Sequence, residues 1–172
     1  MKTALAMFLE RDDARQALAG LDAAGYSAEE IGVLARQEAV EALLDEEPAE
    51  NAAESAGIGA LGGGALGGLI GLLAGASALV LPGLGPALAG GIWATVLGTT
   101  AAGAGIGAAY GGFVGALVGF GVAEEQTHIY EEGIERGGIL LLVRGTDQKR
   151  LEAAAEILAS AGGSGVDVVT KS

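Results

Sequence analysis

Few side chains in this chain could support chemistry. The only histidine, His128, has four glutamates near it at helical spacing, and such a set could form a weak cation site (Glu124, Glu125, Glu131 and Glu132). A surface position on a polar helix is the simpler interpretation, and we predict no metal there. Acidic clusters can also pair two carboxylates for acid–base catalysis, but nothing in the sequence places such a pair in a pocket. The chain has no cysteine, which excludes disulfides and thiolate chemistry.

Residues 57–62, Gly-Ile-Gly-Ala-Leu-Gly, match the dinucleotide-binding pattern G-x-G-x-x-G. That pattern has meaning only after a strand and at the start of a helix. Here it follows an acidic stretch inside a long row of glycines, so we interpret it as a chance match. We therefore predict no catalytic residue, no cofactor and no enzymatic activity. A net charge of -13 also disfavours nucleic acid as a partner, because phosphate contacts need clustered Lys and Arg.

The most unusual stretch is 55–123, which contains no Asp, Glu, Lys, Arg or His. Glycine recurs at every fourth position in two rows, 59–75 and 103–119, and residues four apart lie on one face of a helix. A face of glycines lets a second backbone approach closely, as in the small-xxx-small contacts of membrane helices. We predict ten helix-packing positions: Gly59, Gly63, Gly67, Gly71, Gly75, Gly103, Gly107, Gly111, Gly115 and Gly119.

A proline- and glycine-rich break divides this stretch into two arms. We predict a hairpin turn there, made by Pro82, Gly83, Gly85 and Pro86, between helices over 55–80 and 87–122. Glycine in a water-exposed helix is less favourable than alanine by about 1 kcal/mol per residue. The predicted helical hairpin must therefore be covered by lipid or by protein. A flexible linker fits less well, because bulky aliphatic residues occur throughout.

The flanking parts each predict a strand, a helix and a strand. Ala14, Ala17, Leu18 and Leu21 mark one helix face, and the apolar run 139–143 marks a strand buried on both faces. The predicted fold class is α+β: a split ferredoxin-like βαβ–βαβ domain with the long glycine-rich apolar helical hairpin inserted between strands 2 and 3. The predicted organisation is a first half (1–37), an acidic spacer (38–54), the hairpin (55–123), and a helix with the second half (124–172).

Three stretches carry a family resemblance: AGYSAEEIGVLAR (24–36), LPGLGPALAGG (81–91) and EEQTHIYEEGIERGGILLLVRG (124–145). They resemble the general-stress, heat-induced or low-temperature-induced proteins of bacteria, and the resemblance covers most of the chain. It implies a stress-associated, membrane-linked protein without established enzymatic activity, and it transfers no catalytic residue.

These observations lead to one expected function and to alternatives. We expect a non-enzymatic stress-associated protein of the bacterial cytoplasmic membrane, whose hairpins self-associate in the bilayer while an acidic α/β head lies in the cytoplasm. If the two halves share one sheet, the hairpin must cross the membrane an even number of times. One alternative is a homo-oligomeric particle or ring in the cytoplasm that buries the hairpins. Another is a small-molecule-sensing α/β domain, and a pore is less well supported because no polar stripe is visible.

Overall fold

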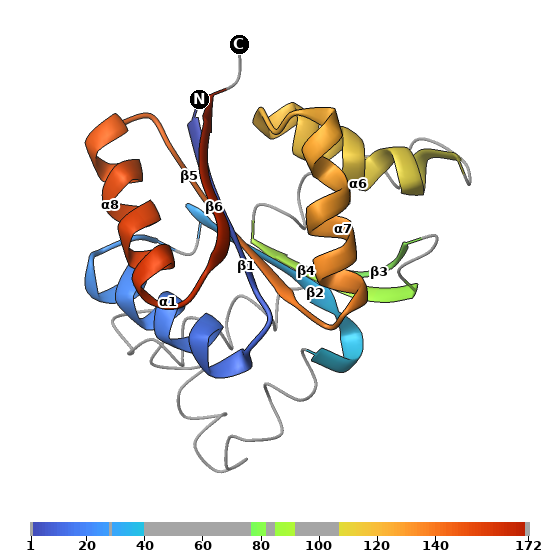
Figure 1. Cartoon of the computed structure of the whole chain (residues 1–172), viewed down its shortest axis with the longest axis horizontal. Coiled ribbons are helices and arrows are strands. Elements are labelled where there is room, and N and C mark those ends of the chain that lie inside the picture. Colours follow the sequence, from blue (N-terminus) through green and yellow to red (C-terminus); the bar gives the residue numbers. More distant parts are fainter. Residues whose placement is uncertain (1, 28, 40–76, 82–84, 92–106, 171–172) are drawn as a thin grey trace.

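The structure, a computed structural model, is built around an antiparallel sheet. It describes residues 2–27, 29–39, 77–81, 85–91 and 107–170 (Figure 1). Four strands lie in the order β2-β5-β1-β6, and β4 and β3 extend the sheet beyond β2. The strands are β1 (Lys2–Phe8), β2 (Ile31–Arg36), β3 (Ser77–Leu81), β4 (Gly85–Gly91), β5 (Ile139–Gly145) and β6 (Ser164–Thr170). The α+β class predicted from the sequence is confirmed.

Helices cover both faces of the sheet. Helices α1 (Arg11–Ala23) and α8 (Gln148–Ser160) lie on one face, and α6 (Gly107–Phe120) and α7 (Thr127–Glu135) lie on the other (Figure 1). A short 3-10 helix, η1 (Glu124–Gln126), precedes α7. Each face has its own apolar core, because successive side chains of a strand point to opposite faces.

The first predicted strand–helix–strand unit is present. In α1 the buried residues are Ala14, Ala17, Leu18 and Leu21, the face that the sequence predicts. The sequence predicts that Asp12 or Asp13 caps this helix, but the helix begins after Glu10 and no side chain caps it. Both aspartates lie in the first turn of the helix, where their negative charges interact favourably with the positive end of the helix dipole. Gly25 follows the end of this helix with φ +78, a conformation that side chains rarely allow.

The second unit follows the same plan. Strand β5 lies between β1 and β2, and residues Ile139 to Val143 are all buried, as its unbroken apolar run predicts. Asp147 caps α8 by accepting a hydrogen bond from the Lys149 backbone N–H at 2.9 Å. Leu151, Ala154 and Leu158 turn toward the sheet. The two units are interleaved, because β5 of the second lies between β1 and β2 of the first.

The predicted helices over 55–80 and 87–122 are wrong at residues 77–80 and 87–91, which lie in strands β3 and β4. Prolines at 82 and 86 disfavour a helix because each lacks a backbone donor and blocks the preceding turn. Pairing of β4 with β2 has a physical reason, because the backbone N–H and C=O groups on the outer edge of β2 would otherwise have no partners in the sheet. Gly32 and Val33 of β2 lie opposite Gly91 and Gly90 of β4. The chain reverses between Leu81 and Gly85, which are paired directly.

The second arm of the predicted hairpin is a helix only in part. Helix α6 spans 14 residues of it, and 92–106 lie outside the described residues. The first arm before Ser77 lies outside them too. Among the helices that the structure describes, none has the length and apolar character that a membrane crossing needs.

Candidate functional site

The predicted helix-packing glycines fall into two groups. Gly107, Gly111, Gly115 and Gly119 lie at successive four-residue steps along α6. The other six, Gly59, Gly63, Gly67, Gly71, Gly75 and Gly103, lie outside the described residues. Of the predicted turn residues, Gly85 and Pro86 belong to β4, while Pro82 and Gly83 lie outside the described residues.

Helix α6 has an inner face that packs on the sheet. Phe113, Leu117 and Phe120 are 3%, 0% and 7% exposed. They join the core that contains Leu5 of β1, Leu34 of β2 and Leu142 of β5. Val114 packs against the same core. This face fixes the helix on the sheet and so determines which residues point outward.

The outer face of α6, formed by Gly115, Val118 and Gly119, points away from the sheet. Gly115 and Gly119 are exposed, and a Cβ added at either would meet no atom within 4 Å. Val118 is 44% exposed. The 14-residue helix has no charged residue, although helices that are apolar all round are usually buried. The outer face is therefore an apolar, notched surface without a partner among the described residues.

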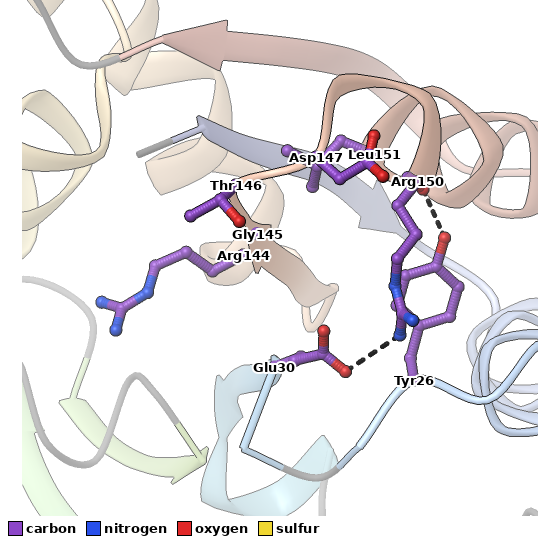
Figure 2. A pocket seen from close by; sticks show the side chains of 8 residues that line it. All are labelled: Tyr26, Glu30, Arg144, Gly145, Thr146, Asp147, Arg150 and Leu151. Carbon is purple, nitrogen blue, oxygen red and sulfur yellow. Dashed lines mark hydrogen bonds and ion pairs between the residues drawn. The ribbon is translucent and has the colours of Figure 1, made fainter.

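A separate small pocket lies where β5 leads into α8. It encloses about 130 Å³, and Figure 2 shows the side chains around it. Gly145 and Leu151 contribute to its wall, and the other lining residues are polar or charged: Tyr26, Glu30, Arg144, Thr146, Asp147 and Arg150. The connection from α1 to β2 thus meets the start of α8 at this pocket.

Arg150 holds one wall of the pocket together. Its guanidinium Nη2 donates to the Gly25 carbonyl at 3.0 Å and to Glu30 Oε2 at 3.2 Å, and it lies 4.7 Å from the centre of the Tyr26 ring. The Tyr26 hydroxyl donates to the Arg150 carbonyl (Figure 2). Burial raises the pKa of Tyr26, and the nearby Arg150 charge opposes that shift. The phenol therefore stays protonated and keeps this hydrogen bond at neutral pH.

Arg144 lies on the other side of the pocket and differs from Arg150. Its backbone N–H donates to the Glu30 carbonyl at 2.8 Å, which fixes the position of the residue. Its side chain extends away from the Glu30–Arg150 pair in Figure 2. In the described part of the chain, the Arg144 guanidinium forms no hydrogen bond and no ion pair. Arg144 follows Leu142 by two residues in β5, so its side chain lies on the sheet face that α6 and α7 cover, away from α8.

His128, the histidine considered above as a cation ligand, and Tyr130 both lie on α7. His128 is exposed on α7, as a surface histidine should be. Tyr130 is 5% exposed, and its hydroxyl donates to the Gly165 carbonyl at 3.2 Å. Burial raises the pKa of Tyr130, and the charge of Asp167 adds to the shift. Tyr130 is therefore part of the core on this face of the sheet.

The glycines after Tyr130 also have structural causes. A Cβ at Gly133 would lie 2.8 Å from the Met7 side chain on β1. Gly137 has φ +86, and the Gly138 N–H donates to the Gly133 carbonyl at 2.9 Å, which ends α7. This run is therefore explained by close packing and by a helix end, without a ligand.

The sequence interpretation missed the pocket at the start of α8. One signal for it was available, since Arg144, Lys149 and Arg150 are three of only nine basic residues and lie within one short stretch. The contact of these residues with Tyr26 and Glu30 could not be predicted from the sequence, because it depends on how segments distant in the sequence pack together. A scan against protein-family models and searches of curated proteins and of solved structures found no match to this chain.

Proposed function

We propose that this protein is a non-enzymatic, self-associating protein whose copies meet through the outer face of α6 and the glycine-rich stretch that leads to it. The observation that carries the proposal is the exposure of Gly115, Val118 and Gly119 on a helix with no charge. Stress association, implied by the family resemblance, stays a prediction.

The energetics of glycine favour a partner on this face. A glycine in an exposed helix is less favourable than alanine by about 1 kcal/mol. Gly115 is in the interior of α6, and its own fold leaves room for a larger side chain. The fold alone thus gives no reason for glycine there. Close approach of a second helix does, because small residues let two backbones pack together.

The lengths of the connecting segments support a protein partner over a bilayer crossing. Strands β2, β3 and β4 lie in one sheet, so 40–76 leaves and re-enters the same body and would have to cross a bilayer an even number of times. Its uncharged part, 55–76, has 22 residues, whereas two crossings need about 40 apolar residues. The connection from β4 to α6, 92–106, has only 15 residues. The cytoplasmic oligomer is therefore our preferred form of the proposal.

We also propose that the four-strand part of the sheet has the split ferredoxin-like arrangement. Its support is the order β2-β5-β1-β6 with antiparallel neighbours, together with two interleaved strand–helix–strand units. In this arrangement β3, β4 and α6 are additions between the units. They complete the edge beside β2 and cover the face opposite α1 and α8.

Sizing of the purified full-length protein without detergent tests the proposal. We expect the wild-type chain to form a defined oligomer and Gly115→Leu to reduce it to smaller species, because leucine fills the notch on α6. A control is Ala153→Leu, which places the same leucine side chain at an exposed position of α8. A wild-type monomer of 16.8 kDa, or a Gly115→Leu variant of wild-type size, would overturn the proposal.

Cell fractionation distinguishes the oligomer from the membrane protein that the sequence predicts. The protein should be released from membranes by carbonate and stay in solution without detergent. Retention in the carbonate-washed membranes would instead favour the predicted membrane hairpin with a cytoplasmic head, and it would contradict the oligomer in the cytoplasm.

A further inference from the structure

We propose that the outer edge of β6 is a second self-association surface, at which two copies of the chain pair their β6 strands antiparallel and join their sheets. This inference goes beyond the proposed function, because it concerns a different element of the fold. Strand β6 ends the sheet on the side away from β3, the strand that α6 contacts. The partner at this edge is a second copy of the same chain.

The outer edge of β6 is open. One edge of this strand pairs with β1, and no described segment pairs with the other edge. Ser164, Gly165 and Asp167 are exposed, and Val166 and Val168 are only partly buried. An unpaired strand edge presents a row of backbone N–H and C=O groups that can bind another strand. A second strand would also cover the remaining surface of the two valines, which pack against the core below α1 and α8.

The backbone limits regular pairing to the C-terminal half of β6. Proteins commonly protect a strand edge with proline, with lysine or with a bulge. Strand β6 contains no proline and no lysine, but its register with β1 shifts between Ser164 and Asp167, where Gly165 has φ +61. Such a bulge bends the strand and interrupts pairing. Residues 167–170 pair with β1 without interruption, so this half offers a regular edge.

Charge then selects one register for two β6 strands. Asp167 is the only charged residue of β6, and like charges directly opposite each other are destabilising, which disfavours a pair centred on Asp167. A pair centred on Val168 leaves Asp167 opposite the apolar Val169. A pair centred on Val169 instead places Asp167 of each copy opposite Lys171 of the other, since Lys171 follows β6 in the sequence. Opposite charges across two strands are stabilising, and twofold symmetry supplies two such pairs.

A second surface also determines how far assembly can proceed. A symmetric surface that binds its own copy is complete in a dimer. When the outer face of α6 and the edge of β6 are both used, dimers can join into a larger assembly such as a ring. The inference therefore predicts that a variant without the α6 contact forms dimers through β6.

Exchange of the charges at 167 and 171 tests the pairing and its register together. Sedimentation velocity of the full-length protein measures the dimer dissociation constant in a Gly115→Leu background, where β6 is the remaining proposed surface. Lys171→Asp or Asp167→Lys replaces two attractive pairs by two repulsive ones and should raise this constant about tenfold or more. The double exchange, Asp167→Lys with Lys171→Asp, should restore it. Lys149→Asp, the same change at an exposed position of α8, should leave it unchanged.

Three results would overturn the β6 pairing. These are an unchanged dissociation constant in Lys171→Asp, a double exchange as weak as the single changes, and a Gly115→Leu variant that stays a single chain at every concentration.

Hydrogen exchange provides a second measurement if Asp167→Lys does not fold. Amides of 166–170 should exchange more slowly in the dimer than in the dilute single chain, by about tenfold or more, and equal exchange would contradict the pairing. If Gly115→Leu keeps the wild-type size, the α6 contact fails, and the same charge series in the wild-type chain still tests β6.

Discussion

Replacing glycine by alanine should have opposite effects on two helices of this protein. In α6, Gly115 is exposed, and an added Cβ meets no atom within 4 Å. In α1, a Cβ at Gly20 would lie 2.7 Å from the Ile157 Cγ2 atom of α8, closer than side chains tolerate. The same chemical change therefore separates an open helix face from a close helix–helix contact.

The expected magnitudes follow from the helix propensity and from packing. Alanine is favoured over glycine in a helix by about 0.8–1 kcal/mol. Gly115→Ala should raise the free energy of unfolding of the single chain by about that amount, or by about 2–4 °C in Tm. At Gly20 the same gain is opposed by an overpacking cost of about 1–3 kcal/mol. Gly20→Ala should therefore lower the free energy of unfolding by up to about 2 kcal/mol.

Urea denaturation followed by circular dichroism measures both effects, at a dilution where sizing shows single chains. The cause of the Gly20 effect is checked with Gly20→Ala combined with Ile157→Ala, which removes the contacting methyl group. The cost of Gly20→Ala should be smaller in that background. Destabilisation by Gly115→Ala in the single chain, or stabilisation by Gly20→Ala, would refute the packing described here.

Three further changes test the described contacts. Tyr130→Phe should reduce the loss of stability at alkaline pH. Burial raises the pKa of Tyr130 above its usual 10.0, so the contribution of Tyr130 to the free energy of unfolding is complete below pH 10 and is lost as pH rises through the raised pKa. Urea titrations from about pH 8 to 11.5 would show the difference between the variant and the wild type. Arg150→Met should lower the free energy of unfolding by about 1–2 kcal/mol, because a partly exposed ion pair with Glu30 and a cation–π contact with Tyr26 are lost; an unchanged urea midpoint would contradict this. Asp147→Ala should cost about 1 kcal/mol by removing the cap of α8, whereas Asp147→Asn should retain most of it.

The elements read correctly from the sequence are those whose signal is local. The buried face of α1 could be predicted because its apolar residues are spaced with the helical period: Ala14, Ala17, Leu18 and Leu21. The central strand β5 follows from five apolar residues in a row. Gly25 and Gly162 mark helix ends, and both have positive φ. Period and glycine position decide these features without help from the rest of the chain.

The sequence predictions are wrong where pairing with segments distant in the sequence determines the secondary structure. Residues 77–81 and 85–91 contain small residues at spacings that suit a helix, yet they pair with each other and with β2. The free edge of β2 exists only after β1, β5 and β2 have assembled, so the local pattern cannot reveal it. The prolines at 82 and 86 were the available warning against a helix. The family resemblance did not correct the predicted helices, because it concerned the glycine-rich stretch as one segment and did not divide it into helices and strands.

The pocket depends on distant segments in the same way. Arg150 and Glu30 are 120 residues apart and meet because α8 begins beside the end of the α1–β2 connection. The basic residues near 144–150 are visible in the sequence, but their partners are not. Whether an arginine has a carboxylate partner can be decided only when these segments are placed together.

Disulfide cross-linking at the outer face of α6 tests self-association most directly. The chain has no cysteine, so Gly115→Cys or Gly119→Cys introduces a single thiol, and a disulfide between copies requires Cα atoms about 4.4–6.8 Å apart. The proposal predicts covalent dimers on mild oxidation of at least one of these variants, and none for Ala153→Cys on α8. Absence of dimers from both α6 variants under conditions where the wild type is assembled, or equal dimerisation of Ala153→Cys, would contradict it.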